Sequence, residues 1–288
     1  MATLYNEFQS KGKMSGIILA LIAALFWGSG DFSGGYATRK ASPFQVLALS
    51  AIAGVTVLGV AALVSRESLP VPGNILWSLL AGLCGAIGIT SLYTGLSRGN
   101  TAAVAPISAV LGAALPVGFT LIVTGAPAVL QMIGFAVALV GIWLVSAAAP
   151  TTAGNKKGLG LAFLAGAGFS GYFIFIGQVK GGGVFFPLLV ARTLMLVVSL
   201  VMLKGRRLAF PPMRQHPMAL VAGLLDSLGN VFFLLSKNLT RLDFAVIISS
   251  LYPAVTVLLA ALLLKEKVAG WQKAGIVLCL AAIILVSV

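Results

Sequence analysis

Three charged residues lie well inside long apolar stretches of this sequence: Asp31, Arg192 and Asp226. Asp226 stands near the middle of the apolar run 220–235, and Asn230 follows four residues later. A helix would place these two side chains on one face. A carboxylate surrounded by hydrocarbon is costly unless it faces protein or water. This face is therefore predicted to meet a partner on another helix or to line a polar cavity.

Arg192 is the candidate partner of Asp226. Asp226 lies about 8 to 10 residues, and Arg192 about 12 residues, from the polar segment between their two apolar runs. At roughly 1.5 Å per helical residue, the two side chains would reach a similar depth. We predict that they pair or share a water-filled pocket. The alternative is a structural ion pair that only holds one helix on the next.

Asp31 has an aromatic neighbour on the same helical face, because Trp27 precedes it by four residues. An aromatic wall beside a carboxylate suits a substrate that carries a cation or an amine. The alternative is a carboxylate that leans toward the membrane interface, since Arg39 and Lys40 follow about two turns later.

The composition places these residues in a membrane protein. Of the 288 residues, 59% are hydrophobic and only 9% are charged, and the mean hydropathy is +1.08. A soluble domain carries roughly 25% charged residues. The net charge of +13 does not indicate a nucleic-acid partner, because the Lys and Arg residues sit in short loops, where they would meet lipid head groups.

Other reactive residues give no sign of catalysis. Cys84 and Cys279 lie inside apolar runs and are predicted to be packing residues, and His216 lies in a loop. The motifs of zinc proteases, serine hydrolases, dithiol redox sites and phosphate-binding loops are absent. We therefore expect no enzyme activity, no metal, no cofactor and no ATP-driven pump. A membrane-embedded enzyme and a channel are the rival classes.

Ten apolar runs are each long enough, near ~20 residues, to cross a bilayer as a helix. They cover about residues 15–37, 43–64, 75–96, 102–123, 128–148, 159–178, 184–203, 218–235, 244–264 and 270–288. Residues 1–14 are expected to form a polar N-terminal tail. The fold class predicted is an all-α membrane protein with ten transmembrane helices.

The ten runs form two copies of five, at residues 15–149 and 155–288. The offset between matching segments stays between 141 and 143 residues. The matches include Ala81-Gly82-Leu83 with Ala222-Gly223-Leu224, Gly88 with Gly229, Gln131-x-x-Gly134 with Gln272-x-x-Gly275, and Leu144-Val145-Ser146 with Leu285-Val286-Ser287. An odd number of spans inverts the second copy. Inverted repeats are typical of secondary transporters, with the site at the repeat interface.

With these features, the sequence resembles the ten-helix EamA-type branch of the drug/metabolite transporter superfamily. The resemblance covers essentially the whole chain. Its motifs are Leu25-Phe26-Trp27-Gly28-Ser29-Gly30-Asp31-Phe32, Ser249-Ser250-Leu251-Tyr252-Pro253, and Lys265-Glu266-Lys267 through Gly275. The chain departs from the family at Thr124-Gly125-Ala126-Pro127, which lacks a glutamate often present there. Gly112 also stands where the second copy has Pro253.

The resemblance implies a central cavity lined by helices 1, 3, 4, 6, 8 and 9. The residues expected to bind substrate there are Trp27, Asp31, Tyr93, Tyr172, Asp226, Asn230 and Tyr252. Further polar residues expected to face inward are Thr90, Thr94, Ser97, Ser249 and Ser250, although a hydroxyl bonded to its own helix is the simpler alternative for each. Arg192, Pro106 and Pro253 are assigned structural or gating roles, with Pro116 as a further kink or packing residue.

The function expected is secondary active transport, by alternating access, of small metabolites such as amino acids or their derivatives, with export favoured. An importer of a sugar- or nucleoside-like solute is the alternative, and a proton-coupled cycle through Asp31 or Asp226 stays open. We expect a multi-pass protein of a bacterial inner or plasma membrane, as a monomer or homodimer, with the lipid bilayer and a small solute as partners.

Orientation gives two conflicting expectations. Six Lys and Arg residues fall on the side of the two termini and twelve on the other side. The positive-inside rule therefore predicts termini outside the cell. The family is usually drawn with cytoplasmic termini.

Overall fold

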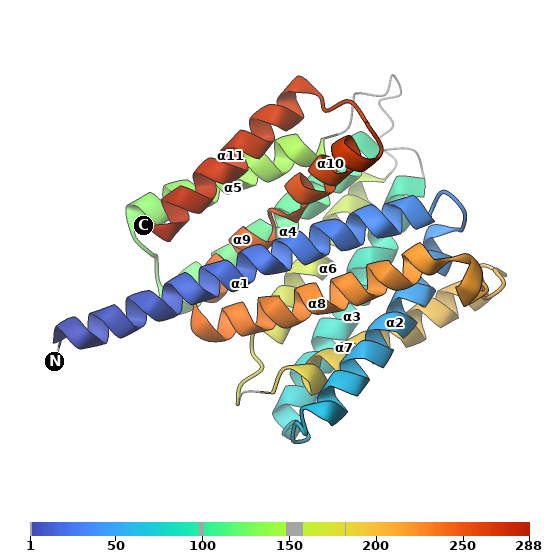
Figure 1. Cartoon of the computed structure of the whole chain (residues 1–288), viewed down its shortest axis with the longest axis horizontal. Coiled ribbons are helices and arrows are strands. Elements are labelled where there is room, and N and C mark those ends of the chain that lie inside the picture. The colour runs from blue at the N-terminus through green and yellow to red at the C-terminus, as the bar shows by residue number, and fades with distance from the viewer. Residues whose placement is uncertain (1, 98–100, 148–157, 182) are drawn as a thin grey trace.

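The computed structural model describes the chain except residues 1, 98–100, 148–157 and 182. It consists of helices joined by short connections (Figure 1), and the described residues contain no strand. The α-helices are α1 (Ala2–Ala37), α2 (Pro43–Val64), α3 (Pro72–Ser97), α4 (Thr101–Thr124), α5 (Val129–Ser146), α6 (Leu159–Ile176), α7 (Phe185–Gly205), α8 (Pro217–Leu239), α9 (Leu242–Ser249), α10 (Tyr252–Leu263) and α11 (Gly270–Ser287). A short 3₁₀ turn, η1 (Met213–Gln215), precedes α8.

Ten stretches of the described chain are long and apolar enough to span a membrane, which confirms the predicted fold class. Nine of them are single helices. The last but one, Leu242–Leu263, is divided into α9 and α10. The break falls just before Pro253, whose ring excludes the carbonyl of Ser249 from helical bonding. By contrast, α4 continues through both Pro106 and Pro116, so neither proline breaks its helix.

The predicted N-terminal tail, residues 1–14, stays a prediction as a separate domain; in the structure, α1 is helical from Ala2 and runs without a break to Ala37. No glycine or proline lies among residues 2–11 to stop the helix. The expected junction between the two copies, at residues 149–155, lies entirely within the segment 148–157, outside the described residues.

The two sequence copies interleave in space. The helix pairs in most extensive contact are α1 with α8, α3 with α6, α5 with α11, α4 with α6 and α2 with α7, and each joins one copy to the other. The pairing obeys a pseudo-twofold relation: α1 packs on α8, and its counterpart α6 packs on α3, the counterpart of α8. Figure 1 shows α1 beside α8 and α5 beside α11. The packing of each copy therefore depends mainly on helices of the other.

Glycines at matching positions make matching contacts. A Cβ atom at Gly82 would stand 2.9 Å from the Cα atom of Ala191, and a Cβ atom at Gly223 would stand 2.6 Å from the Cα atom of Ser50. Both pairs are related by an offset of 141 residues. Gly134 against Val286 and Gly275 against Val145 are related by the same offset, and Gly88 against Phe169 and Gly229 against Trp27 by offsets of 141 and 142. Close approach of bare helix backbones is what small residues provide in lipid.

The substitution Gly223→Ala is expected to lower the free energy of unfolding by more than about 2 kcal/mol, because its methyl group would overlap the backbone of Ser50. Gly118→Ala is the matched control, since a Cβ atom there meets nothing within 4 Å. The control should be neutral or stabilising by up to ~1 kcal/mol, through helix propensity. Thermal unfolding of the purified proteins measures both. Equal unfolding temperatures for the two variants would contradict the close approach.

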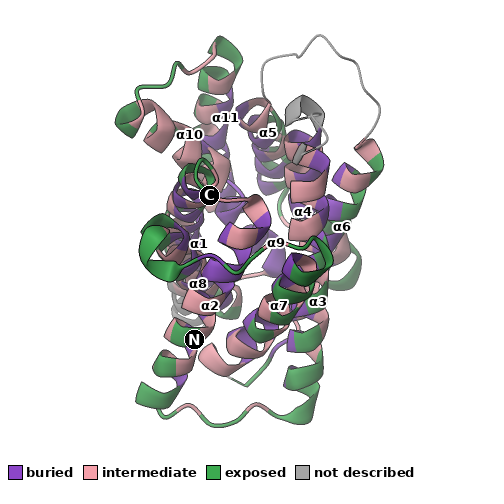
Figure 2. Ribbon diagram, turned by 90° about the vertical axis from the view of Figure 1, so that its right-hand side faces the viewer, coloured by how far each residue is buried: buried purple, intermediate pink, exposed green. Residues whose placement is uncertain are grey.

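Large apolar side chains cover the outer faces of the bundle. Figure 2 shows buried residues where helices meet and exposed residues on outward faces and connections. The exposed apolar side chains include Ile122, Leu262 and Val64, which are 86%, 74% and 78% exposed. A surface of this kind suits contact with lipid.

Candidate functional site

A cavity of about 680 Å³ lies at the centre of the bundle. Residues of α1, α2, α3, α4, α6, α7, α8 and α10, and Ser250 in the break before α10, form its wall. The wall includes all seven residues expected to bind substrate, Trp27, Asp31, Tyr93, Tyr172, Asp226, Asn230 and Tyr252. Their contact with a solute stays a prediction.

Arg192 and Asp226 form the predicted ion pair, with 2.6 Å between Arg192 Nη1 and Asp226 Oδ2. The Arg192 side chain is only 7% exposed, whereas that of Asp226 is 37% exposed. The second nitrogen, Nη2, donates to the hydroxyl of Ser50 at 3.0 Å and to the Ser50 carbonyl at 3.2 Å. The guanidinium thus ties α7 to α8 and to α2.

Asp226 also belongs to a polar chain that runs across the cavity. Asn230 Nδ2 donates to the Asp226 carbonyl at 2.7 Å and to its carboxylate at 3.2 Å. The hydroxyl of Tyr172 donates to Asn230 Oδ1. These bonds confirm that Asp226 and Asn230 share a face, and they link α8 to α6.

Asp31 lines the same cavity and is exposed there. Its carboxylate forms no hydrogen bond or ion pair with any described residue. The neighbouring Gly30 packs on α8, where a Cβ atom would stand 3.3 Å from the backbone nitrogen of Asp226. Asp31 is therefore an unpaired carboxylate near the Arg192–Asp226 pair.

Four aromatic side chains pack together at one end of the cavity. Trp27 contacts Phe173, Phe233 and Tyr252 with ring centroids 5.7, 5.6 and 6.3 Å apart, and Phe173 lies 5.0 Å from Phe233. Phe173 belongs to the last turn of α6 and Phe233 is fully buried. We call this cluster the aromatic plug. It closes the cavity toward the end of the bundle where α2 meets α3 and α6 meets α7, which we call the sealed end.

The cavity opens toward the opposite end of the bundle. The wall residues that lie next to helix ends there are Gly35, Thr38, Pro43 and Leu96, at the end of α1, the start of α2 and the end of α3. On the sealed side, the described wall residues nearest to helix ends are Phe173 and Leu188, and each lies three residues inside its helix. We call the end that contains Thr38 the open end.

Hydrogen bonds between distant connections hold the sealed end together. Glu67, between α2 and α3, accepts from the backbone N–H groups of Val184, Phe185 and Phe186 at 3.1, 2.9 and 3.0 Å. These groups form the start of α7, where a negative charge is favourable. Asn74 Nδ2 donates to the Lys180 carbonyl at 2.6 Å, and the Lys180 N–H donates to Asn74 Oδ1 at 3.2 Å.

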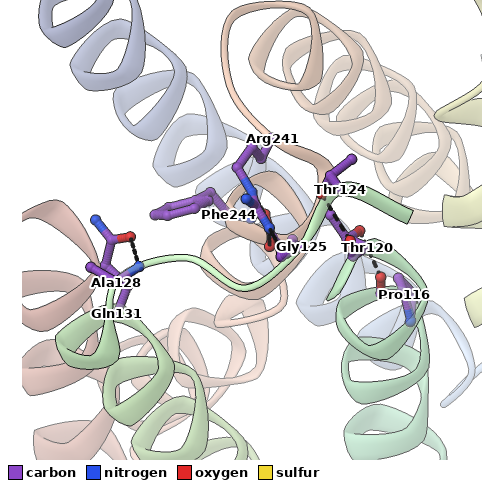
Figure 3. A network of polar contacts seen from close by, with 9 residues as sticks. Pro116, Thr120, Thr124, Gly125, Ala128, Gln131, Arg241 and Phe244 are labelled. Atoms are coloured by element: carbon purple, nitrogen blue, oxygen red, sulfur yellow. Dashed lines mark hydrogen bonds and ion pairs between the residues drawn. The ribbon is translucent and has the colours of Figure 1, made fainter. Parts of the chain in front are cut away.

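Arg241 adds a further link at this end (Figure 3). Its Nη2 atom donates to the Gly125 carbonyl at 2.6 Å and pairs with Asp243 Oδ2 at 2.7 Å. Asp243 is fully buried in the first turn of α9. This charge was not predicted inside a span, because the apolar run was expected to begin at residue 244. The short spacing to Arg241 was the available signal.

The substitution Glu67→Ala is expected to lower the free energy of unfolding by about 1–2 kcal/mol, because three N–H groups lose a charged acceptor. Glu266→Gln is the control: its ion pair with Arg39 is also 2.9 Å long, but both side chains are 55% exposed. An exposed pair contributes roughly 0–1 kcal/mol. Thermal unfolding of both variants in the same detergent measures the two losses of stability. A loss in Glu67→Ala no larger than that in Glu266→Gln would contradict the proposed capping of α7 by Glu67.

Several residues expected to face inward are bonded to their own helices instead. Thr90 Oγ1 donates to the Ala86 carbonyl at 2.7 Å, and the Ser249 hydroxyl donates to the Ala245 carbonyl at 2.7 Å. Neither lines the cavity, and neither does Thr94. The Ser97 side chain lies outside the described residues, while Ser250 does line the cavity.

The expected set of wall helices was incomplete, because α2 and α7 also contribute. The polar wall residues that were missed are Thr38, Ser50, Ser108, Ser227 and Thr256. A single serine in an apolar run carries no distinguishing signal. Arg192, which was assigned a structural or gating role, lines the cavity as well.

The described residues contain no group of three or more His, Cys, Asp or Glu side chains that could hold a metal ion. Cys84 and Cys279 are free thiols, and Cys279 packs against Gly141 between α11 and α5.

Comparison with known proteins adds two findings. The sequence model of a family described as "EamA-like transporter family" matches residues 14–147 and again 156–288. A solved structure described as "Crystal structure of protein" is similar at 18% sequence identity and a TM-score of 0.71; the match covers 94% of this chain and 96% of that chain. This similarity shows that the chain shares the fold of that structure. A search of curated proteins finds no match.

Proposed function

The chain belongs to the EamA-like transporter family, and we propose that it is a secondary active transporter that exports small metabolites such as amino acids or their derivatives. Transport of small solutes across a membrane follows from the family and the ten apolar spans. The substrate class, the direction and the alternating-access mechanism are our proposal.

The observation that carries the proposal is a central cavity with one open end and one sealed end. Its volume of about 680 Å³ lies within the roughly 300–1,000 Å³ typical of small-molecule sites. The cavity lies between helices related by the pseudo-twofold, where inverted-repeat transporters bind their substrates. A site reached from one end only is what one state of an alternating-access cycle requires.

The conformational change follows from the same symmetry. Exchanging the roles of the two copies would seal the present open end and open the sealed one. Because the copies interleave, we propose that the moving units combine helices of both copies, such as α1 with α8 and α3 with α6. The sealed-end links of Glu67, Asn74 and Arg241 would break in this step.

The charges favour an exporter of an amine-bearing metabolite over an importer of a neutral sugar. The open end carries twelve of the Lys and Arg residues and the sealed end carries six. The positive-inside rule would place the open end in the cytoplasm, where an exporter loads its solute. A cavity wall with two carboxylates and a guanidinium suits a charged solute.

Counterflow into proteoliposomes tests this function. The full-length protein is reconstituted with an excess of one unlabelled amino acid or amino-acid amide inside, and uptake of the same labelled compound is measured. We expect transient accumulation that saturates with external concentration for at least one compound. The variant Ala109→Trp, which fills the cavity from α4, should remain folded and lose counterflow. Flux that rises linearly with concentration, or no counterflow with any compound, would overturn the proposal.

Impermeant labelling of single cysteines at the two termini in intact cells tests the orientation. Labelling of both is expected if the open end faces the cytoplasm.

A further inference from the structure

We propose that Asp31 is the subsite for a positively charged group, so that the transported solute is a monocationic amine, and that this charge allows the open end to close. The inference rests on the proposed function and names the class of solute. Three independent features of the cavity lead to it: its charge balance, its aromatic wall and its pseudo-symmetry.

The charge balance leaves one negative charge without a partner. The charged residues of the described wall are Asp31, Arg192 and Asp226. Arg192 and Asp226 neutralise each other at 2.6 Å. Asp31 remains unpaired, and an ionised carboxylate in a partly dehydrated cavity favours a bound cation.

A solute carboxylate would find no free cation in this wall. Arg192 Nη1 pairs with Asp226, and Nη2 donates to Ser50. The remaining nitrogen, Nε, is buried without a hydrogen-bond partner. It lies against α2, where a Cβ atom at Gly54 would stand 2.5 Å away. A zwitterionic amino acid would have to displace Asp226 or leave its carboxylate unpaired, and both are costly.

The aromatic wall near Asp31 suits an amine. Trp27 lies one helical turn before Asp31 on α1, and the two line the cavity together with Tyr93 and Tyr252. Trp27 and Tyr252 meet edge to face, with ring centroids 6.3 Å apart. Aromatic faces attract cations, most strongly where water is excluded. These rings would cover the apolar part of an amine while Asp31 binds its charge.

The pseudo-symmetry gives Asp31 a second role. Residues of α1 and α6 correspond with an offset of 142, and residues of α3 and α8 with an offset of 141, as the mirrored contacts of Gly88 and Gly229 establish. Of the four residues of the aromatic plug, Tyr252 corresponds to Leu111, which does not line the cavity. The other three and their open-end counterparts are Trp27 and Phe169, Phe173 and Asp31, and Phe233 and Leu92. All three counterparts line the cavity. Asp31 thus stands where the plug of the sealed end has Phe173.

Closing the open end by the same packing would bury the Asp31 carboxylate among Phe169 and Leu92. An ionised carboxylate without a partner is costly in such a place. A cation bound to Asp31 removes that cost. The open end of the empty carrier therefore resists closure. A positively charged solute bound to Asp31 allows the open end to close, so solute binding is coupled to the transport step.

A series of probes that share one phenyl ring and differ in charge tests the subsite. The probes are phenethylamine as the cation, phenylalanine as the zwitterion, hydrocinnamate as the anion and phenethyl alcohol as the neutral member. Their half-saturating concentrations are taken from the rise in unfolding temperature of the purified full-length protein. We expect phenethylamine to bind at least ~10-fold more tightly than each of the others.

Variants assign the preference to Asp31. Asp31→Asn should weaken the binding of phenethylamine relative to that of phenethyl alcohol by ~10-fold or more, because a change in the open fraction affects both probes equally, while Asp31→Glu should keep the preference for the cation. Glu266→Gln removes the same charge from an exposed ion pair and should bind like the parent. Absence of phenethylamine binding, equal or tighter binding of any other probe, or an unchanged preference in Asp31→Asn would overturn the proposal.

Failure of the subsite and failure of the proposed function give different results. Saturable counterflow of a zwitterionic amino acid, together with no preference for the cationic probe, would overturn the proposed cation site at Asp31. The proposed transport function would then still stand. A preference for the cation that depends on Asp31, without counterflow of any compound, would overturn the proposed transport function. The proposed cation site in the cavity would then still stand.

Discussion

Replacing Asp226 with asparagine is expected to lower the free energy of unfolding by about 2–3 kcal/mol, because Arg192 would stay buried without its counter-ion. The Arg192 side chain is 7% exposed and lies 2.6 Å from Asp226. Loss of one partner from a fully buried pair costs about 3–5 kcal/mol. The lower figure is expected here because Asp226 is 37% exposed to the cavity, where water screens the pair. Thermal unfolding of the purified protein in detergent measures the change.

The two partners should differ in this test. Arg192→Met is expected to cost less, about 1–2 kcal/mol, because the Asp226 carboxylate left behind can still meet water in the cavity. The double variant should be no less stable than Asp226→Asn alone, since the buried charge is gone. A larger loss of stability in Arg192→Met than in Asp226→Asn would show that the exposed partner, and not the buried one, limits stability.

The same variant separates a structural role of the pair from a role in transport. If Asp226 contributes only stability, Asp226→Asn that is folded at the assay temperature will transport like the parent. If the pair shapes the binding cavity, counterflow should fall ~10-fold or more while the protein remains folded, because the wall changes from one net negative charge to none. The fraction folded, measured by size-exclusion chromatography, is the necessary control.

The spans and the inverted copies could be predicted from the sequence because both depend on local, one-dimensional signals. Runs of apolar residues define the helices, and the constant offset aligns glycines such as Gly82 with Gly223. The Arg192–Asp226 pair could also be predicted from the sequence, because two rare charges at the same depth have few other partners in lipid. The break before Pro253 was not predicted, because proline chemistry alone does not distinguish it from Pro106 and Pro116, through which α4 continues.

The packing partners could not be predicted in the same way. Apolar faces of transmembrane helices are chemically alike, so they do not indicate that α1 packs on α8 in the other copy. The capping of α7 by Glu67 joins residues that are far apart in the sequence and leaves no pattern. Which end is sealed depends on how Trp27, Phe173 and Phe233 meet in three dimensions.

Neutralising Asp31 is expected to shift the ligand-free protein toward a state in which the open end is closed. Leu92 provides the reporter position: it now lines the cavity and is half-buried, whereas its counterpart Phe233 is fully buried in the aromatic plug. A cysteine at 92 should therefore react with a hydrophilic maleimide only while the open end is open. The native thiols are removed by Cys84→Ser and Cys279→Ser.

In this background, Asp31→Asn should slow the labelling of Leu92→Cys by at least ~10-fold relative to the protein that keeps Asp31, because closure no longer buries an ionised carboxylate. Glu266→Gln should label at the parent rate. Equal or faster labelling in Asp31→Asn would show that Asp31 does not oppose closure. Because no ligand is present in this comparison, slower labelling cannot come from a solute that covers the thiol. It would report the closing of the helices around position 31.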